Sequence, residues 1–441
     1  MKKILPVLIG VLASCLTAVA DPSPSPSAAH KLECVALDPL LAQENPWELP
    51  AESFVTDHKE ADFRWVSNAR DAADSSRPGL SLFKLSVYQA IARFSGGKLH
   101  ELCFSFYNRG DAGELPRDQF EALLKQAANA VTDFTKLKFT ERGKDSASAV
   151  KAFGLVWQTA QSQFLLEYSF TKSPAAFYRA EFIRLTVLPV EKPKGLLEAS
   201  LAASRGAEKF NGPSHLKNSA DGDVFIEGIP MVDQGEKGYC VVASAERVIR
   251  YYGGKADEHE LAQIANSSAE SGTSVTAMLD SLKKLSNRLR IKIRTVESFD
   301  TQHFLALVKE YNRAAQHGKQ ADPVDLNGAH ATLSDVYQQM DGKILRESRT
   351  KNPGEMNRFF RGVQTHINQG IPLLWSVMIG VLPQPKDPKG YGGHMRLIIG
   401  YNAKTNEIIY SDSWGLGHEM KRIPLADAWT ITNSLNTIEP L

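Results

Sequence analysis

The second half of the chain shows helical apolar patterns first and strand-like patterns mainly afterwards. Apolar residues recur at helical spacing over 240–252, 257–265, 275–285, 302–315 and 357–368. Strand-like runs lie at 291–296, 372–379, 394–401, 407–411 and 418–423. Helices placed ahead of mostly antiparallel strands are typical of an α+β domain with two lobes. Residues 223–441 are therefore predicted to form such a domain.

The first half has its own succession of elements and is expected to fold separately, because 441 residues are enough for two cores. Strands are predicted at 80–94, 102–107, 150–159, 164–170 and 177–188. Ser95-Gly96-Gly97-Lys98 is a hairpin signal, and a helix is predicted to begin at Pro116. We predict a smaller α+β domain at 31–190 and a linker at 191–222. No catalytic constellation is found in 31–190, so a prodomain, a targeting module and an unrelated partner module stay open as its role.

The N-terminal end has the features of a secretory signal. Lys2 and Lys3 precede an apolar run and the small residues Ala18-Val19-Ala20, which predicts a signal peptide at 1–20. Residues 21–30 are rich in Pro and Ser and predict a spacer. The protein is thus expected to be exported, either periplasmic or secreted. Leu12-Ala13-Ser14-Cys15 also resembles a lipobox, so a lipid anchor at Cys15 is the alternative.

Charge and composition exclude several classes of partner. Lys and Arg number 51 against 50 Asp and Glu, a balance that gives no support to a nucleic-acid partner. After the signal, no stretch approaches the apolar length of a membrane span. Neither an HExxH nor a CxxC pattern occurs, so no metal and no cofactor are predicted.

Three cysteines lie beyond the predicted signal. Cys34 and Cys103 both belong to the first half and could form a disulfide in an oxidising compartment. Cys240 would then be the odd cysteine, and an odd thiol in an exported protein suggests a chemical role.

Cys240 is the first candidate catalytic residue. Apolar residues at helical spacing place it at the start of a helix, whose N-terminus favours a thiolate by lowering the thiol pKa. Gly235 and Gly238 let the preceding loop fold tightly, which could bring Gln234 beside the sulfur. The Cys240 backbone N–H and the Gln234 amide would then donate to an oxyanion. On this segment alone, a buried core cysteine is an equally good interpretation.

His394 and Asp412 are the candidate base and its partner. His394 opens an apolar strand, and Gly392 and Gly393 before it leave close access to the ring. Asp412 ends the next strand, so an antiparallel pairing could set its carboxylate against the imidazole. Taken singly, each also fits a plain structural role, as a core histidine or a turn residue. His418 is the second candidate for the base.

The three segments together resemble the papain-like cysteine peptidases, and most closely the bacterial C39-like branch. A Gln, five further residues and a Cys at a helix start carry the likeness, together with the strand-opening His and Asp412-Ser413-Trp414-Gly415. The resemblance implies that Gln234 is the oxyanion donor, Cys240 the nucleophile, His394 the general base and acid, and Asp412 its orienter. Trp414 matches the tryptophan that shields the histidine's hydrogen bond from water, and Gly238 and Gly393 support the site.

The resemblance covers the chain from about residue 223 onward and has departures. Tyr239 and Val241 replace the residues that flank the nucleophile in papain, and Asp412 stands where papain has Asn. The spacing between Cys240 and His394 is longer than in papain, which an insertion around 322–353 would explain. The segment 380–391 is expected to be a surface loop beside the site, with a lid as the alternative.

The implied function is hydrolysis of peptide or isopeptide bonds in a peptide or protein substrate by an exported cysteine peptidase. Acyl transfer from the same thioester, with an amine in place of water, is one alternative. An inactive module that binds peptides in the same groove is another. The four candidate residues Gln234, Cys240, His394 and Asp412 occur together, which favours an enzyme.

Overall fold

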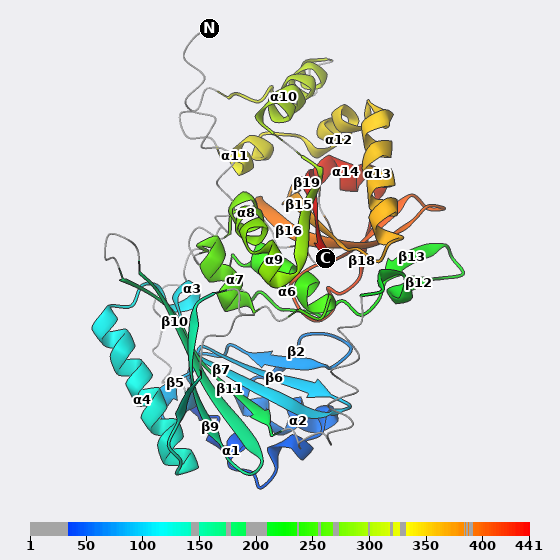
Figure 1. Ribbon diagram of the computed structural model, residues 1–441. Coiled ribbons are helices and arrows are strands. Elements are labelled where there is room, and N and C mark those ends of the chain that lie inside the picture. Colours follow the sequence, from blue (N-terminus) through cyan, green and yellow to red (C-terminus); the bar gives the residue numbers. More distant parts are fainter. Residues whose placement is uncertain are drawn as a thin grey trace. The chain divides into compact units, whose positions relative to one another are not determined.

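A computed structural model gives the fold of two compact units, one ending at Phe210 and the other beginning at Asn211 (Figure 1). The described residues are 34–142, 150–172, 178–190, 210–235, 238–254, 257–267, 273–298, 300–317, 321–326, 332–382, 384, 387 and 391–441. The predicted signal, the spacer, Cys15 and residues 191–209 of the predicted linker lie outside them.

The first unit is built on an antiparallel sheet of eight strands. Their order is β2 (Arg64–Trp65), β3 (Ala72–Ser75), β6 (Gln89–Ser95), β7 (Lys98–Asn108), β11 (Tyr178–Pro189), β10 (Ser162–Lys172), β9 (Ala152–Gln158) and β8 (Thr140–Arg142). The helix α4 (Arg117–Thr135) begins after Pro116 and packs on β9, β10 and β11. The predicted hairpin is confirmed: Gly96 and Gly97 turn between β6 and β7 with φ of 59° and 75°.

The strand predicted at 80–94 is wrong, because the chain turns within it. Phe83 and Lys84 adopt left-handed conformations with φ of 53° and 64° and divide the segment into β4 (Leu80–Leu82), β5 (Leu85–Ser86) and β6. β4 pairs with β5 and with β1 (Val35–Ala36) in a small separate sheet. Short helices complete the unit, namely α1 (Asp38–Leu41), η2 (Pro46–Glu48), α2 (Ala51–Asp57), η3 (Lys59–Ala61) and α3 (Arg109–Ala112).

The disulfide predicted between Cys34 and Cys103 is also wrong. Cys34 carries a free, exposed thiol beside the small sheet, and its Sγ lies 3.3 Å from Ser81 Oγ. Cys103 is buried in β7 with its Sγ 3.9 Å from Thr186 Oγ1 on β11. The two cysteines thus belong to different sheets, a separation that the sequence alone does not reveal.

The second unit has another antiparallel sheet of eight strands. Its main order is β12 (Leu216–Asn218), β13 (Asp223–Ile226), β16 (Gly392–Asn402), β15 (Leu373–Ile379), β19 (Thr432–Pro440) and β14 (Ile291–Glu297). β17 (Glu407–Ser411) also pairs with β16, and β18 (Lys421–Pro424) pairs with β17. The strands β12 and β13 come before the helices, and β12 lies inside the predicted linker. The sheet therefore draws on both ends of the unit rather than only on its later part.

The predicted helices of this unit are confirmed to within a few residues at most ends. They are α6 (Cys240–Tyr251), α7 (Glu258–Ala265), α8 (Val275–Lys284), α10 (Thr301–Gln316) and α13 (Pro353–Ile367). Side-chain caps fix several starts: Asp257 Oδ1 accepts from the backbone N–H groups of His259 and Glu260 at the start of α7. Further helices were not predicted, namely η4 (Gly212–His215), α9 (Ser286–Leu289), α11 (Leu333–Gln338), α12 (Gly342–Thr350) and α14 (Leu425–Ile431).

The core of the second unit lies between the sheet and the helices α6, α7 and α8. Val242, Val248 and Ile249 of α6 pack with Leu374, Leu397 and Ile438 of the sheet. Every α6 residue from Cys240 to Ile249 is buried, including Glu246 and Arg247. The helix is therefore a central element rather than an amphipathic surface helix, which fixes its N-terminus firmly.

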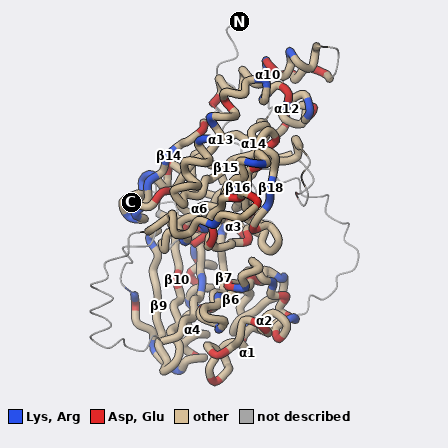
Figure 2. The backbone as a smooth tube through the Cα atoms, turned by 90° about the vertical axis from the view of Figure 1, so that its right-hand side faces the viewer, with Lys and Arg blue, Asp and Glu red and all other residues tan. Residues whose placement is uncertain are grey.

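Charges of both signs are interspersed along the described part of the chain (Figure 2). Within the described residues, no helix has the length and apolar character needed to cross a bilayer.

Candidate functional site

Cys240 is the first residue of α6. Its side chain is 1% exposed, and α6 packs against β16, the strand that carries His394. Tyr239 is the N-cap residue, and its side chain makes no capping hydrogen bond to the helix. The N-terminal N–H groups of a buried helix carry partial positive charge, so a thiolate at Cys240 is stabilised by its position.

The loop with Gln234 leads into α6 and is tied to the end of β17. The Gln234 backbone N–H donates to the carbonyl oxygen of Ser413 at 2.9 Å. Gly235 has a φ of 60°, and its N–H donates to Asp233 Oδ1 at 2.9 Å, which turns the chain sharply after Gln234. These bonds hold Gln234 beside the residue that follows Asp412. The glutamine side chain is 7% exposed.

His394 and Asp412 form a buried pair, as the sequence pattern predicts for their strands. His394 Nε2 lies 2.6 Å from Asp412 Oδ1, and the two side chains are 2% and 0% exposed. β16 and β17 are antiparallel neighbours, with Leu397 opposite Ser411. With Nε2 engaged by the carboxylate, Nδ1 is the ring nitrogen left for exchange of a proton with a thiol.

The second carboxylate oxygen of Asp412 contacts two cations. Arg396 Nε and Lys421 Nζ each lie 3.2 Å from Asp412 Oδ2. Burial disfavours the charged form, but Arg396, His394 and Lys421 outweigh it and hold the pKa of Asp412 well below its usual range. Asp412 is therefore a carboxylate at neutral pH.

Trp414 covers the histidine, as the family resemblance implies. Its ring is stacked on His394 with centroids 4.3 Å apart and an interplanar angle of 7°. The His418 ring meets the Trp414 ring edge-on, with their centroids 5.6 Å apart. The backbone carbonyl of His418 accepts from the Asp412 N–H at 2.9 Å. His418 thus supports the loop, whereas the carboxylate bond orients His394.

The two glycines singled out from the sequence hold backbone positions next to the site. Gly238 precedes Cys240 by two residues, and its carbonyl accepts from Thr273 Oγ1 at 3.2 Å. Gly393 lies on β16 opposite Met378 of β15. Both positions belong to the framework that holds Cys240 and His394.

Sequence reasoning missed the basic residues that hold the site together. Arg247 lies on α6, is 2% exposed, and donates to three oxygens. These are the carbonyl of Pro230 at 2.9 Å, the carbonyl of Asp412 at 2.9 Å and Ser411 Oγ at 2.5 Å. Burial lowers the pKa of Arg247 to about 10, which still leaves it charged at neutral pH. No signal for this role is present in the sequence, because Arg247 lies on the helix face opposite the apolar stripe and resembles an ordinary surface residue.

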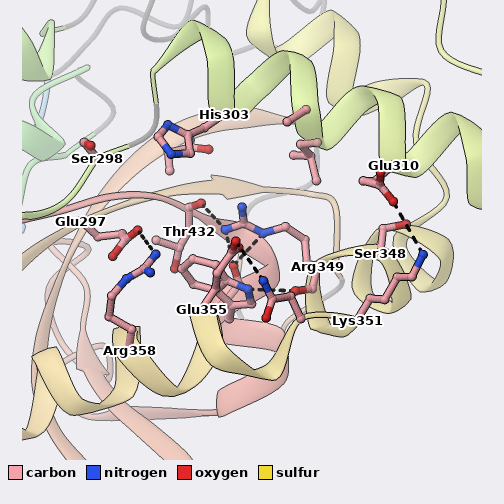
Figure 3. Close-up of a pocket in the computed structure, with 15 residues that line it drawn as sticks. Glu297, Ser298, His303, Glu310, Ser348, Arg349, Lys351, Glu355, Arg358 and Thr432 are labelled. Atoms are coloured by element: carbon pink, nitrogen blue, oxygen red, sulfur yellow. Dashed lines mark hydrogen bonds and ion pairs between the residues drawn. The ribbon is translucent and has the colours of Figure 1, made fainter.

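A pocket of about 510 Å³ lies elsewhere in the same unit (Figure 3). Its walls come from α10, α12, α13 and the chain around Trp429 and Thr432. Two ion pairs lie in its lining: Arg358 is 3.4 Å from Glu297, and Lys351 is 3.7 Å from Glu310. Its lining, taken from the described residues, shares no member with the site at Cys240.

Metal chemistry has no candidate ligand set in the described part of the chain. No group of three or more His, Cys, Asp and Glu side chains there is arranged to hold an ion.

Comparison with known proteins finds a family match within the second unit. Residues 226–436 match the family described as "Peptidase_C39 like family". Among solved structures, xylellain, a cysteine protease from Xylella fastidiosa, is similar at 15% identity with a TM-score of 0.27. That alignment covers 52% of this chain and 88% of xylellain, and at this score it adds nothing to the family match. No curated protein matches the chain.

Proposed function

We propose that this protein is exported and that its C-terminal half is a C39-like cysteine peptidase domain of papain-like fold. This domain hydrolyses peptide or isopeptide bonds in its substrates outside the cytoplasm. The observation that carries this proposal is the buried His394–Asp412 pair on the strand against which the helix of Cys240 packs. A histidine oriented by a carboxylate beside a cysteine at a helix start is the arrangement that nucleophilic thiol catalysis requires. The family match supports a peptide or protein as the substrate.

The proposed reaction begins with a thiolate at Cys240 and an imidazolium at His394. The sulfur attacks the carbonyl carbon, a C–S bond forms, and the oxyanion accepts hydrogen bonds from the Cys240 N–H and the Gln234 amide. His394 Nδ1 gives its proton to the leaving amine as the C–N bond breaks. A water then loses a proton to Nδ1 and attacks the thioester, which releases the carboxylic acid and restores the thiolate.

The primary test is labelling of the nucleophile with an epoxide-type inhibitor of papain-like peptidases, measured by intact-mass spectrometry. We expect one adduct on the wild type and none on Cys240→Ala, with Cys34→Ser labelled like the wild type because Cys34 lies in the other unit. Folded wild-type protein with a free thiol at Cys240 and no adduct would contradict the proposal and favour a peptide-binding module. Product analysis with an added amine separates hydrolysis from acyl transfer.

Substitution of Gln234 by alanine tests the oxyanion donor. One donor of this kind is worth about 2.7–4 kcal/mol of transition-state stabilisation, so kcat is expected to fall by about 10²–10³-fold. KM should change little, because the bond is made mainly in the transition state. The backbone bond from Gln234 to Ser413 is kept in the variant. An unchanged kcat in the folded variant would remove Gln234 from the mechanism.

A further inference from the structure

The carboxylate of Asp412 contacts a histidine and two cationic side chains. Oδ1 takes the contact with His394, and Oδ2 takes those with Arg396 and Lys421. Arg396 is fully buried and Lys421 has a side chain only 10% exposed, so water screens these contacts weakly. A carboxylate that only orients a histidine needs one contact, the one with the ring. The contacts of Arg396 and Lys421 with the same carboxylate therefore point to a further role for these two cations.

A second carboxylate completes the cluster. Asp387 Oδ2 lies 2.6 Å from Arg396 Nη2, and Asp387 Oδ1 lies 3.1 Å from Lys421 Nζ. Arg396 also donates to Gln384 Oε1 at 2.8 Å and lies over the Tyr410 ring, 4.6 Å from its centroid. The two aspartates and the two cations cancel one another. The cluster is thus neutral before any charge on His394 is counted.

This balance changes what Asp412 can do for the histidine. A carboxylate with no other partner strongly stabilises an imidazolium, since an opposite charge at close range favours the charged form. Here the negative charge is already compensated by Arg396 and Lys421. An imidazolium at His394 then depends on the thiolate of Cys240 as its counter-ion. Such a histidine gives up its proton more readily to a leaving amine.

We propose that Arg396 and Lys421 are positioning residues that weaken the stabilisation of a His394 imidazolium by Asp412. The carboxylate then orients the ring, and the ring can still release its proton. This inference rests on the proposed function, because it assigns a purpose to a proton that His394 must release during hydrolysis. Asp412, at the position where papain has Asn, thus orients the histidine as a carboxylate whose charge is compensated by Arg396 and Lys421.

The charged and titratable groups around the pair come from every element packed on it. They are Cys240 and Arg247 of α6, Arg396 of β16, Tyr410 of β17, His418 and Glu419 of the following loop, Lys421 of β18 and Asp387 of the segment before β16. Of these, only Arg396 and Lys421 are cations in contact with the Asp412 carboxylate itself. Lys421 is the better residue to change, because it lies on a short outer strand and is not fully buried.

The test is NMR titration of the His394 ring in the wild type and in Lys421→Met, with the signals assigned by their loss in His394→Ala. We expect the titration midpoint of His394 to rise by about one pH unit in Lys421→Met, because one compensating cation is lost. Lys421→Arg keeps the charge and should restore the wild-type midpoint. Arg422→Met is the matched control, since Arg422 is the next residue on β18 but pairs with Asp223.

An unchanged midpoint in folded Lys421→Met would overturn the inference, and so would an equal shift in Arg422→Met. If Lys421→Met does not fold, the conservative Lys421→Gln is titrated with the same expectation. The ring titration does not depend on hydrolysis. The inference can therefore fail while Cys240 is still labelled by the inhibitor, and loss of labelling in the wild type would instead contradict the proposed function.

Discussion

Replacement of His394 by alanine is expected to lower kcat/KM for peptide hydrolysis by about 10³-fold, with labelling of Cys240 slowed to a similar degree. Proton transfer by a positioned histidine contributes about 10²–10⁴-fold in enzymes of this kind. The expected value lies well inside that range because the ring is positioned from two sides. Asp412 Oδ1 contacts Nε2 at 2.6 Å, and Trp414 is stacked on the ring face at 4.3 Å.

The measurement compares second-order rate constants for inhibitor labelling in three proteins. His418→Ala is the matched control, because His418 also contacts Trp414 but its backbone carbonyl bond to Asp412 survives the substitution. We expect His418→Ala to react within a few-fold of the wild type. A strong loss in His418→Ala combined with near-normal His394→Ala would reverse the assignment of the base.

Replacement of Arg247 by methionine is expected to lower the free energy of unfolding by about 3 kcal/mol or more. The substitution leaves the carbonyls of Pro230 and Asp412 and the Ser411 hydroxyl without their buried donor. Each buried polar group that loses its partner costs about 1–3 kcal/mol. Methionine fills most of the volume of the arginine stem, so the loss reports the missing bonds more than a cavity.

Thermal unfolding gives the readout. For a domain of this size, such a loss corresponds to a fall in Tm of about 6–12 °C. Arg313→Met is the control on α10 of the same unit: Arg313 pairs with Glu310 at 2.7 Å, and its side chain is 60% exposed. We expect a change below about 1 kcal/mol for an exposed pair. Equal unfolding midpoints for the two variants would show that Arg247 does not hold the site together.

The elements of the second unit were largely predictable because their signals are local. Apolar spacing and caps such as Asp257 marked most helices, and apolar runs marked β15, β16 and β17. The errors arose where local signals were weak or misleading. β19 and α14 were missed because the stretch after Pro424 has no clear period, and the segment 80–94 was divided by left-handed turns at Phe83 and Lys84.

The placement of the candidate site residues was predictable for a related reason. Cys240 at a helix start, His394 at a strand start and Asp412 at the next strand end are each positions along one element. Antiparallel pairing of β16 and β17 then suffices to bring His394 and Asp412 together. The proposed disulfide failed because it depended on distance between elements, which spacing of cysteines does not encode.

By itself, the sequence indicated which residues are candidates for the proposed chemistry and determined on which kind of element each one lies. Only the tertiary structure decided how their charges are compensated. Arg247, Arg396 and Lys421 come from separate segments, and nothing in their sequence neighbours marks them as partners of Asp412. The same holds for Asp387 as the partner of Arg396 and Lys421. Electrostatic interactions act through space at distances of a few ångströms, so they follow from the packing of the whole unit, whereas helix and strand patterns follow from neighbours along the chain.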